Sequence, residues 1–257
     1  AARAVFERAD AVLAAEFDAS LSHLCFEGPA EAVHRTNVSQ PAIYTVSIAC
    51  WHGLYGADAI PTAAAGLSLG EYTALHLAGA FSFEDGLRLV AKRGALMQKA
   101  AEATDGGMVA VMGASVEEAE QFCEEISGSS GVLVPANINA PGQIVLSGDT
   151  DACNRAVEAC SDRGWRATLL SVAGAFHSPL MASAADAMLD VLAETEILSL
   201  QAEVWTNVTA SRYPADSSDV IRRTLADQIT SPVRWSSQMA AMIEAGMGCW
   251  TELAPGK

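Results

Sequence analysis

The sequence predicts an α/β fold, in which a large hydrolase-like domain with a parallel sheet core carries an inserted ferredoxin-like (βαββαβ) small lobe. Three observations lead to this prediction. Short apolar runs alternate with amphipathic helical spacing along most of the chain. Residues 108–172 follow the order strand, helix, strand, strand, helix, strand, which is the split βαβ pattern. After residue 172 the alternation of helix and strand resumes, so the lobe is an insertion.

The large domain is expected to comprise residues 1–104 and 172–257, and the lobe residues 105–171. In the large domain, helical spacing predicts helices at 1–13, 37–54, 71–78, 83–103, 178–194, 220–228 and 237–245, and apolar runs predict strands at 59–65, 203–206 and 249–253. In the lobe, the same patterns predict strands at 108–112, 132–137, 143–147 and 167–172, and helices at 115–126 and 151–163. A break at Thr104-Asp105-Gly106-Gly107 marks the boundary.

The composition excludes several classes of protein. The chain has 257 residues, of which 51% are hydrophobic and 18% charged, and its formal net charge is −16. This charge repels phosphate, and Lys and Arg form no run, so nucleic acid is not expected as a partner. The longest uncharged stretch, residues 36–57, contains polar side chains and favours a buried helix over a membrane span. Six cysteines without a CxxC pair favour a reduced, cytoplasmic compartment.

The segment Gly66-Leu67-Ser68-Leu69-Gly70 matches Gly-x-Ser-x-Gly and lies between a predicted strand and a predicted helix. In that context the glycines allow a sharp turn that exposes the serine hydroxyl, while the next backbone N–H and the helix dipole face developing negative charge. Ser68 is therefore a candidate nucleophile. The alternative is an ordinary tight strand-to-helix loop with an N-capping serine.

A serine nucleophile needs a base, and of the five histidines only His177 has a suitable position. It follows an apolar run, directly before Ser178-Pro179, at a predicted strand-to-helix junction. Such an edge position can direct a side chain at a serine in the same sheet. The alternative is a capping or partly buried histidine with no catalytic role.

Six segments, in order, resemble one family, the malonyl-CoA:acyl carrier protein transacylases, whose acyltransferase fold also occurs in polyketide synthases. The segments are Gly66 to Tyr72 (GLSLGEY), Lys92 to Gln98 (KRGALMQ), Asn137 to Gln143 (NINAPGQ), Gly174 to Met181 (GAFHSPLM), Ser231 to Trp235 (SPVRW) and Glu252 to Lys257 (ELAPGK). Together they cover nearly the whole chain. Six matches in the family's order identify the family far more specifically than any single match does.

The resemblance implies a reaction. A malonyl group would pass from malonyl-CoA to Ser68 and then to the phosphopantetheine thiol of an acidic acyl carrier protein, supplying extender units for fatty acid biosynthesis. A discrete acyltransferase of polyketide synthesis is the alternative. The family uses no metal or cofactor, and neither nucleic acid nor a membrane is an expected partner.

The resemblance also implies roles for single residues. His177 would act as general base and then general acid, oriented by the backbone carbonyl of Ser231, and the Leu69 N–H would be one oxyanion donor. Arg93 would bind the malonyl carboxylate. The remaining residues expected to contact substrate are Gln40, Met97, Asn139 and Phe176. Taken without the resemblance, Arg93 would be read as part of a solvated face with Arg88 and Lys92, and Met97 as a core residue.

Three features depart from the family pattern. Leu67 replaces the histidine that usually precedes the nucleophile, and Ala254 replaces a glycine. The family's N-terminal strand and the GQGSQ loop that supplies a second oxyanion donor have no counterpart in the sequence. We interpret that difference, together with the start at Ala1, as trimming of the ends.

Two other functions compete with acyl transfer. A serine hydrolase shares the Gly-x-Ser-x-Gly turn but needs an acid for its histidine and no cation at the acyl group. A catalytically inactive scaffold for the carrier protein would be compatible with Leu67. For docking of an acidic carrier, the arginines expected to form a basic patch are Arg155, Arg163 and Arg166, followed by Arg222 and Arg223.

Overall fold

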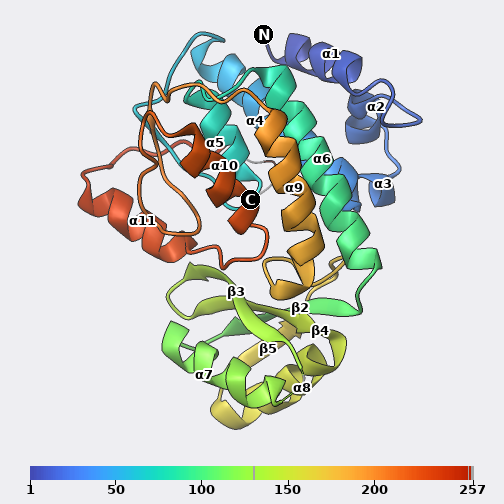
Figure 1. Ribbon diagram of the computed structural model, residues 1–257, viewed down its shortest axis with the longest axis vertical. Helices are drawn as coiled ribbons and strands as arrows, with labels where there is room; N and C mark the ends of the chain where they lie inside the picture. Colours follow the sequence, from blue (N-terminus) through green and yellow to red (C-terminus); the bar gives the residue numbers. More distant parts are fainter. Residues whose placement is uncertain (130, 254, 256–257) are drawn as a thin grey trace.

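The computed structural model describes residues 1–129, 131–253 and 255. A large, mainly helical body carries a smaller lobe at one end, and the chain enters and leaves that lobe once (Figure 1). This arrangement confirms the predicted α/β fold with an inserted lobe. Ala254, one of the departures from the family pattern, lies outside the described residues. No helix in the described ranges has both the length and the apolar character that crossing a membrane requires.

The body contains most of the helices. They are α1 (Ala2–Val12), α2 (Leu21–Phe26), α3 (Ala30–His34), α4 (Thr36–Tyr55), α5 (Gly70–Leu77), α6 (Phe83–Glu102), α9 (Ala182–Glu194), α10 (Ser218–Asp227) and α11 (Trp235–Glu244), with a short 3₁₀ turn η2 (Pro179–Met181) before α9. The sequence analysis missed α2 and α3, because helices of six and five residues are too short to show a helical period.

The body also contains a parallel strand pair. In it, β1 (Ala63–Ala64) pairs with β6 (Glu203–Val204). Both strands are shorter than predicted, and the strand predicted at 249–253 is absent from these described residues. That prediction was wrong because an apolar run forms a strand only beside a pairing partner, and here Cys249 and Trp250 lie exposed.

The lobe has the ferredoxin-like topology that the sequence predicts. Its elements are β2 (Gly106–Met112), α7 (Val116–Ser127), β3 (Leu133–Ala140), β4 (Gln143–Asp149), α8 (Thr150–Cys160), η1 (Ser161–Arg163) and β5 (Arg166–Leu169). The antiparallel sheet has the strand order β3-β4-β2-β5, and α7 and α8 pack on one face of it (Figure 1). The lobe has its own buried cluster, around Phe122 and Leu146. Its predicted boundaries, 105 and 171, stay a prediction.

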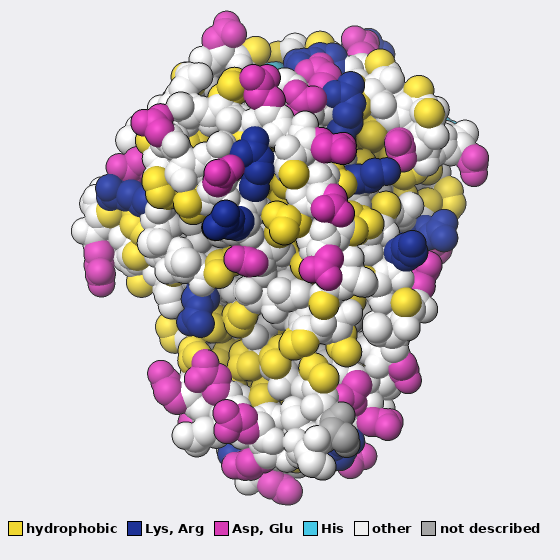
Figure 2. All heavy atoms as spheres, in the orientation of Figure 1, with side chains coloured by type: hydrophobic (Ala, Val, Ile, Leu, Met, Phe, Trp, Pro, Cys, Tyr) yellow, Lys and Arg dark blue, Asp and Glu magenta, His cyan; other side chains and the backbone are white. Residues whose placement is uncertain are grey.

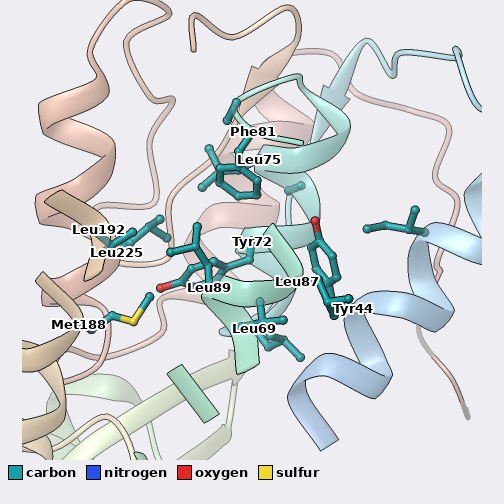
Figure 3. Close-up of a cluster of buried hydrophobic side chains, with 14 of the residues drawn as sticks. Tyr44, Leu69, Tyr72, Leu75, Phe81, Leu87, Leu89, Met188, Leu192 and Leu225 are labelled. Atoms are coloured by element: carbon teal, nitrogen blue, oxygen red, sulfur yellow. The ribbon is translucent and has the colours of Figure 1, made fainter. Parts of the chain in front are cut away.

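The main core lies between α4, α5, α6 and α9 (Figure 3). Helices α4 and α6 pack most closely, and a glycine makes that approach possible. A Cβ added to Gly86 of α6 would lie 2.0 Å from the Tyr44 hydroxyl oxygen of α4. Tyr44 is fully buried and stacks on Phe83, with ring centroids 5.7 Å apart. Its ring therefore has no free space into which it could move.

Two glycine substitutions in helices test this packing. We expect Gly86→Ala to lower the free energy of unfolding by about 1–3 kcal/mol, because the added methyl group overpacks the contact with Tyr44. Gly53→Ala in α4 is the matched control, since its Cβ would meet nothing within 4 Å, and it should raise stability by up to about 1 kcal/mol. Denaturant unfolding measures both. Equal stability of the two variants would contradict the packing described.

Candidate active site

The Gly-x-Ser-x-Gly segment forms a sharp turn between β1 and α5. Ser68, at its apex, has a φ of 51°, in the left-handed region that costs free energy for a residue with a side chain. Gly66 makes the turn possible, because a Cβ there would lie 2.0 Å from the backbone carbonyl carbon of Gly70. The side chain of Asn207, from a distant segment of the chain, binds the backbone of the turn. Its Oδ1 accepts the Ser68 N–H at 2.6 Å and its Nδ2 donates to the Gly66 carbonyl at 2.8 Å.

Ser68 and His177 lie in direct contact. The distance between Ser68 Oγ and His177 Nε2 is 2.8 Å. His177 Nδ1 lies 2.8 Å from the backbone carbonyl of Gln228. A carbonyl can only accept a hydrogen bond, so Nδ1 carries the proton in the neutral ring and Nε2 is left to accept the proton of the serine hydroxyl. The imidazole is thus set up as a base for Ser68.

The carbonyl that orients His177 corrects one prediction. The resemblance placed this role on Ser231, whereas the hydrogen bond goes to Gln228, three residues earlier. The physical reason is that α10 ends at Asp227, so Gln228 caps the helix and its carbonyl has no partner within the helix. The Ser231 backbone lies near enough to raise the pKa of His177 as well.

The protonation state of His177 suits the role of a base. Burial of the ring, together with the positive charge of Arg93, lowers the pKa of His177 to about 4, against the opposing effect of the Gln228 and Ser231 backbones. The imidazole is therefore neutral at physiological pH and can accept a proton.

Arg93 is buried and is not part of a solvated face with Arg88 and Lys92. Its side chain, on α6, is 1% exposed. Nη1 donates to Gln40 Oε1 at 2.8 Å, and Nη2 donates to Ser68 Oγ at 3.0 Å and to Gln228 Oε1 at 2.9 Å. Within the described part of the chain, no carboxylate lies within ion-pair distance of it. Arg93 is thus a buried cation whose hydrogen-bond partners are all neutral, and one of them is the nucleophile. Such a cation provides a site for an anionic group next to Ser68.

A cavity of about 410 Å³ opens onto these residues. Seven of the nine predicted site residues line it: Gln40, Ser68, Leu69, Arg93, Met97, Phe176 and His177. Asn139 and Ser231 are not among the lining residues, and Asn137, which lies on the same strand β3 as Asn139, lines the cavity instead. Leu67 forms part of the wall and is 40% exposed, so an apolar side chain stands where the family has an imidazole.

The backbone N–H of Leu69 is the oxyanion donor that the turn leaves available. The Ser68 N–H is occupied by Asn207, whereas the Leu69 N–H donates no hydrogen bond to any described residue. It lies at the N-terminus of α5, where the helix dipole adds to its attraction for negative charge.

Three residues of the site were missed by the sequence analysis: Glu71, Asn207 and Gln228. All three are fully buried and hydrogen-bonded around the turn. Glu71 directly follows the Gly-x-Ser-x-Gly segment, and that position is the one signal that could have marked it. Asn207 and Gln228 are more than 130 residues from Ser68 in sequence, in segments whose apolar pattern says nothing about where an amide side chain points.

The predicted basic patch is only partly free. Arg155 donates to the Ile126 carbonyl, Arg163 pairs with Glu125, and Arg222 donates to the carbonyls of Leu192 and Thr195. Arg166, on the exposed strand β5, and Arg223, on α10, make no ion pair with a described residue. These two remain available to a partner.

Fold and geometry together define a class: proteins that transfer acyl groups through a serine activated by a histidine. Comparison with known proteins gives the family. The family model described as "Acyl transferase domain" matches residues 1–256. The chain belongs to this acyltransferase family, which confirms the resemblance inferred from the six sequence segments.

Characterised relatives and solved structures agree with the family. The chain is 38% identical to the malonyl CoA-acyl carrier protein transacylase of Bacillus subtilis over all of its length and 80% of that protein. It is 36% identical to the enzyme of the same name from Salmonella typhimurium, over 95% of the chain and 80% of the relative. The structure of the Coxiella burnetii malonyl CoA-acyl carrier protein transacylase superposes with a TM-score of 0.92 at 35% identity, covering 99% of this chain and 79% of that one.

The pKa of His177 gives a test of the site's electrostatics. We expect the ring to stay neutral down to about pH 5 and to protonate below that, as followed by NMR of the ring, assigned by comparison with His177→Ala. Arg93→Ala should raise this pKa, because it removes a nearby positive charge. Arg88→Ala on the exposed face of the same helix is the control and should leave it unchanged. A ring that titrates at its ordinary pKa, near 6.5, would contradict the geometry.

Proposed function

We propose that this protein transfers a malonyl group from malonyl-CoA to the phosphopantetheine thiol of an acyl carrier protein, through a malonyl ester on Ser68. One observation carries the proposal: the buried guanidinium of Arg93 has no carboxylate partner among the residues that the structure describes, and it donates a hydrogen bond to the nucleophilic oxygen. An acetyl group leaves that cation without a counter-ion, whereas a malonyl group supplies a carboxylate at the required distance from the ester. The planar fork of arginine can hold that carboxylate with two parallel hydrogen bonds.

The geometry supports a reaction in two halves. His177 Nε2 takes the proton of Ser68 as Oγ attacks the thioester carbonyl, and the Leu69 N–H stabilises the oxyanion. The C–S bond breaks, and the coenzyme A thiolate leaves with the proton from His177. In the second half, His177 takes the proton of the carrier thiol, the thiol attacks the malonyl ester, and Ser68 Oγ leaves with that proton. The chain supplies nucleophile, base and cation itself, so the proposed reaction needs no cofactor or metal.

The competing functions have less support. Hydrolases with this turn orient their histidine by an acid side chain, whereas His177 is oriented by a backbone carbonyl and the cation beside Ser68 would have no task. An inactive scaffold would not need a serine, a base and a cation in contact.

The expected partner follows from the relatives. One solved complex joins a type II polyketide synthase acyl carrier protein to its malonyl-transacylase, at a TM-score of 0.92 and 35% identity over 99% of this chain and 81% of that one. Fatty acid biosynthesis is the proposed pathway and a discrete acyltransferase of polyketide synthesis is the alternative, because the chain covers 80% of the B. subtilis transacylase and also 80% of the polyketide biosynthesis malonyl CoA-acyl carrier protein transacylase BaeC of Bacillus velezensis. The polyketide protein ThaF of Burkholderia thailandensis, at 40% identity, matches over 20% of its length. A cytoplasmic location is part of the proposal and rests on the cysteine usage of the sequence.

Acyl selectivity tests the role of Arg93. We expect the wild-type protein to load malonyl-CoA in preference to acetyl-CoA and, because Phe176 lines the acyl cavity, in preference to methylmalonyl-CoA. Arg93→Ala should lower the ratio of malonyl to acetyl loading by a hundredfold or more, because the variant leaves a buried carboxylate unpaired at a cost of about 3–5 kcal/mol. Arg88→Ala is the matched control. A ratio that stays constant in Arg93→Ala would refute the assignment.

Charge reversal tests the docking of the carrier protein. Figure 2 shows acidic side chains over both body and lobe, so an acidic carrier is repelled at long range unless a local cation offsets the field. Arg166→Glu should raise the KM for carrier protein and leave the loading by malonyl-CoA unchanged. Arg3→Glu in α1, at the opposite end of the molecule (Figure 1), is the control. An unchanged KM for Arg166→Glu at low salt would contradict this assignment.

A further inference from the structure

Glu71 is a fully buried acid that the acyl-transfer steps do not use. It lies in the first turn of α5, three residues after the nucleophile, and its side chain is 0% exposed. Three donors surround the carboxylate. The Tyr213 hydroxyl donates to Oε1, while the Asn207 N–H, at 3.1 Å, and Gln228 Nε2, at 2.6 Å, donate to Oε2. The last two donors belong to residues that contact the reacting groups.

Gln228 connects Glu71 to three parts of the active site. Its Nε2 donates both to Glu71 and to the Ser68 carbonyl at 3.0 Å. Its Oε1 accepts Arg93 Nη2 at 2.9 Å, and its backbone carbonyl accepts the His177 ring. One side-chain amide thus links the buried acid to the cation that faces the substrate.

The orientation of that amide depends on Glu71. A carboxylate and a carbonyl can only accept hydrogen bonds, so the NH₂ group of Gln228 must face Glu71 and Ser68, and its oxygen is left for Arg93. With the amide reversed, NH₂ would face the guanidinium and the oxygen would face the carboxylate, which places donor against donor and acceptor against acceptor. Without Glu71 the amide loses the nearest of the acceptors that favour the observed orientation.

We propose that Glu71 is a positioning residue which, through the Gln228 amide, holds Arg93 at the malonyl carboxylate and so contributes to the choice of malonyl over acetyl. This inference rests on the proposed function. Glu71 touches neither substrate nor reacting atoms. Through the Gln228 side-chain oxygen its effect reaches Arg93, the group that recognises the carboxylate, so its loss weakens malonyl loading more than acetyl loading.

Hydrogen bonding, and not the charge of Glu71, carries this effect. Burial raises the pKa of Glu71 to about 7, and the hydrogen bonds from Tyr213, Gln228 and Asn207 each oppose that rise more than the charge of Arg93 does. Glutamine at position 71 would retain an oxygen at the place of Oε2 and could donate to the Tyr213 oxygen. It would therefore preserve the orientation of Gln228 while removing the charge.

The test compares malonyl with acetyl loading, as kcat/KM for each CoA ester, in four variants of the full chain. In Glu71→Ala the ratio of malonyl to acetyl should fall about tenfold or more, the effect of losing one hydrogen bond to a charged group. Glu71→Gln should bring the ratio back to within a few-fold of wild type. Gln228→Met, which removes the amide but keeps the backbone carbonyl for His177, should lower the ratio as Glu71→Ala does.

The fourth variant separates positioning from mere loss of stability. Tyr213→Phe removes a hydrogen bond from the same buried carboxylate without touching Gln228, so it should lower the melting temperature and leave the ratio unchanged. An equal loss for both acyl groups in Glu71→Ala would overturn the proposal. So would a ratio in Glu71→Gln as low as in Glu71→Ala. If Glu71→Ala does not fold, an unchanged ratio in Gln228→Met overturns it. A wild-type protein with no preference for malonyl would instead refute the proposed function itself.

Discussion

The buried guanidinium of Arg93 is the interaction on which the rest of the site depends. A charge removed from water costs several kcal/mol unless hydrogen bonds and a counter-charge replace the lost solvation. Here α4 supplies Gln40, the segment after α10 supplies Gln228, and the turn after β1 supplies Ser68. None of these partners carries a charge. The fold thus brings three distant segments together around a cation and leaves its counter-charge to the substrate.

The nucleophile is held by a second constraint, the strained turn. Ser68 and His177 both have positive φ values, 51° and 57°, which residues other than glycine rarely adopt. Such conformations persist only where the surroundings determine them. Gly66 packs against the backbone of Gly70, Asn207 binds the Ser68 N–H and the Gly66 carbonyl, and the core beneath α5 is closely packed (Figure 3). These contacts hold the serine and the imidazole against each other before any substrate arrives.

What the sequence could predict depends on how local each feature is. The lobe, the turn and the long helices were predictable because their periods and glycines lie within short windows, as with Gly66 to Gly70. Arg93 could be assigned only through the resemblance, since spacing alone favours a solvated face. Asn207 and Gln228 could not be found, because their contacts with Ser68 cross more than 130 residues, whereas the position of Glu71 directly after the Gly-x-Ser-x-Gly segment was a usable signal. Ser231 was chosen in place of Gln228 because the resemblance places the orienting carbonyl in the segment at 231–235, whereas the end of α10 at Asp227 leaves the Gln228 carbonyl free to accept the His177 ring.

The most direct test of the account is the intact mass of the protein after incubation with malonyl-CoA alone. A serine, an imidazole and a cation that act together should yield a protein carrying one malonyl group, at near stoichiometric level, with the ester on Ser68. Addition of carrier protein bearing a phosphopantetheine thiol should then discharge it, and Ser68→Ala should gain no mass. An unlabelled protein, or one that releases coenzyme A continuously while no carrier is present, would contradict the account.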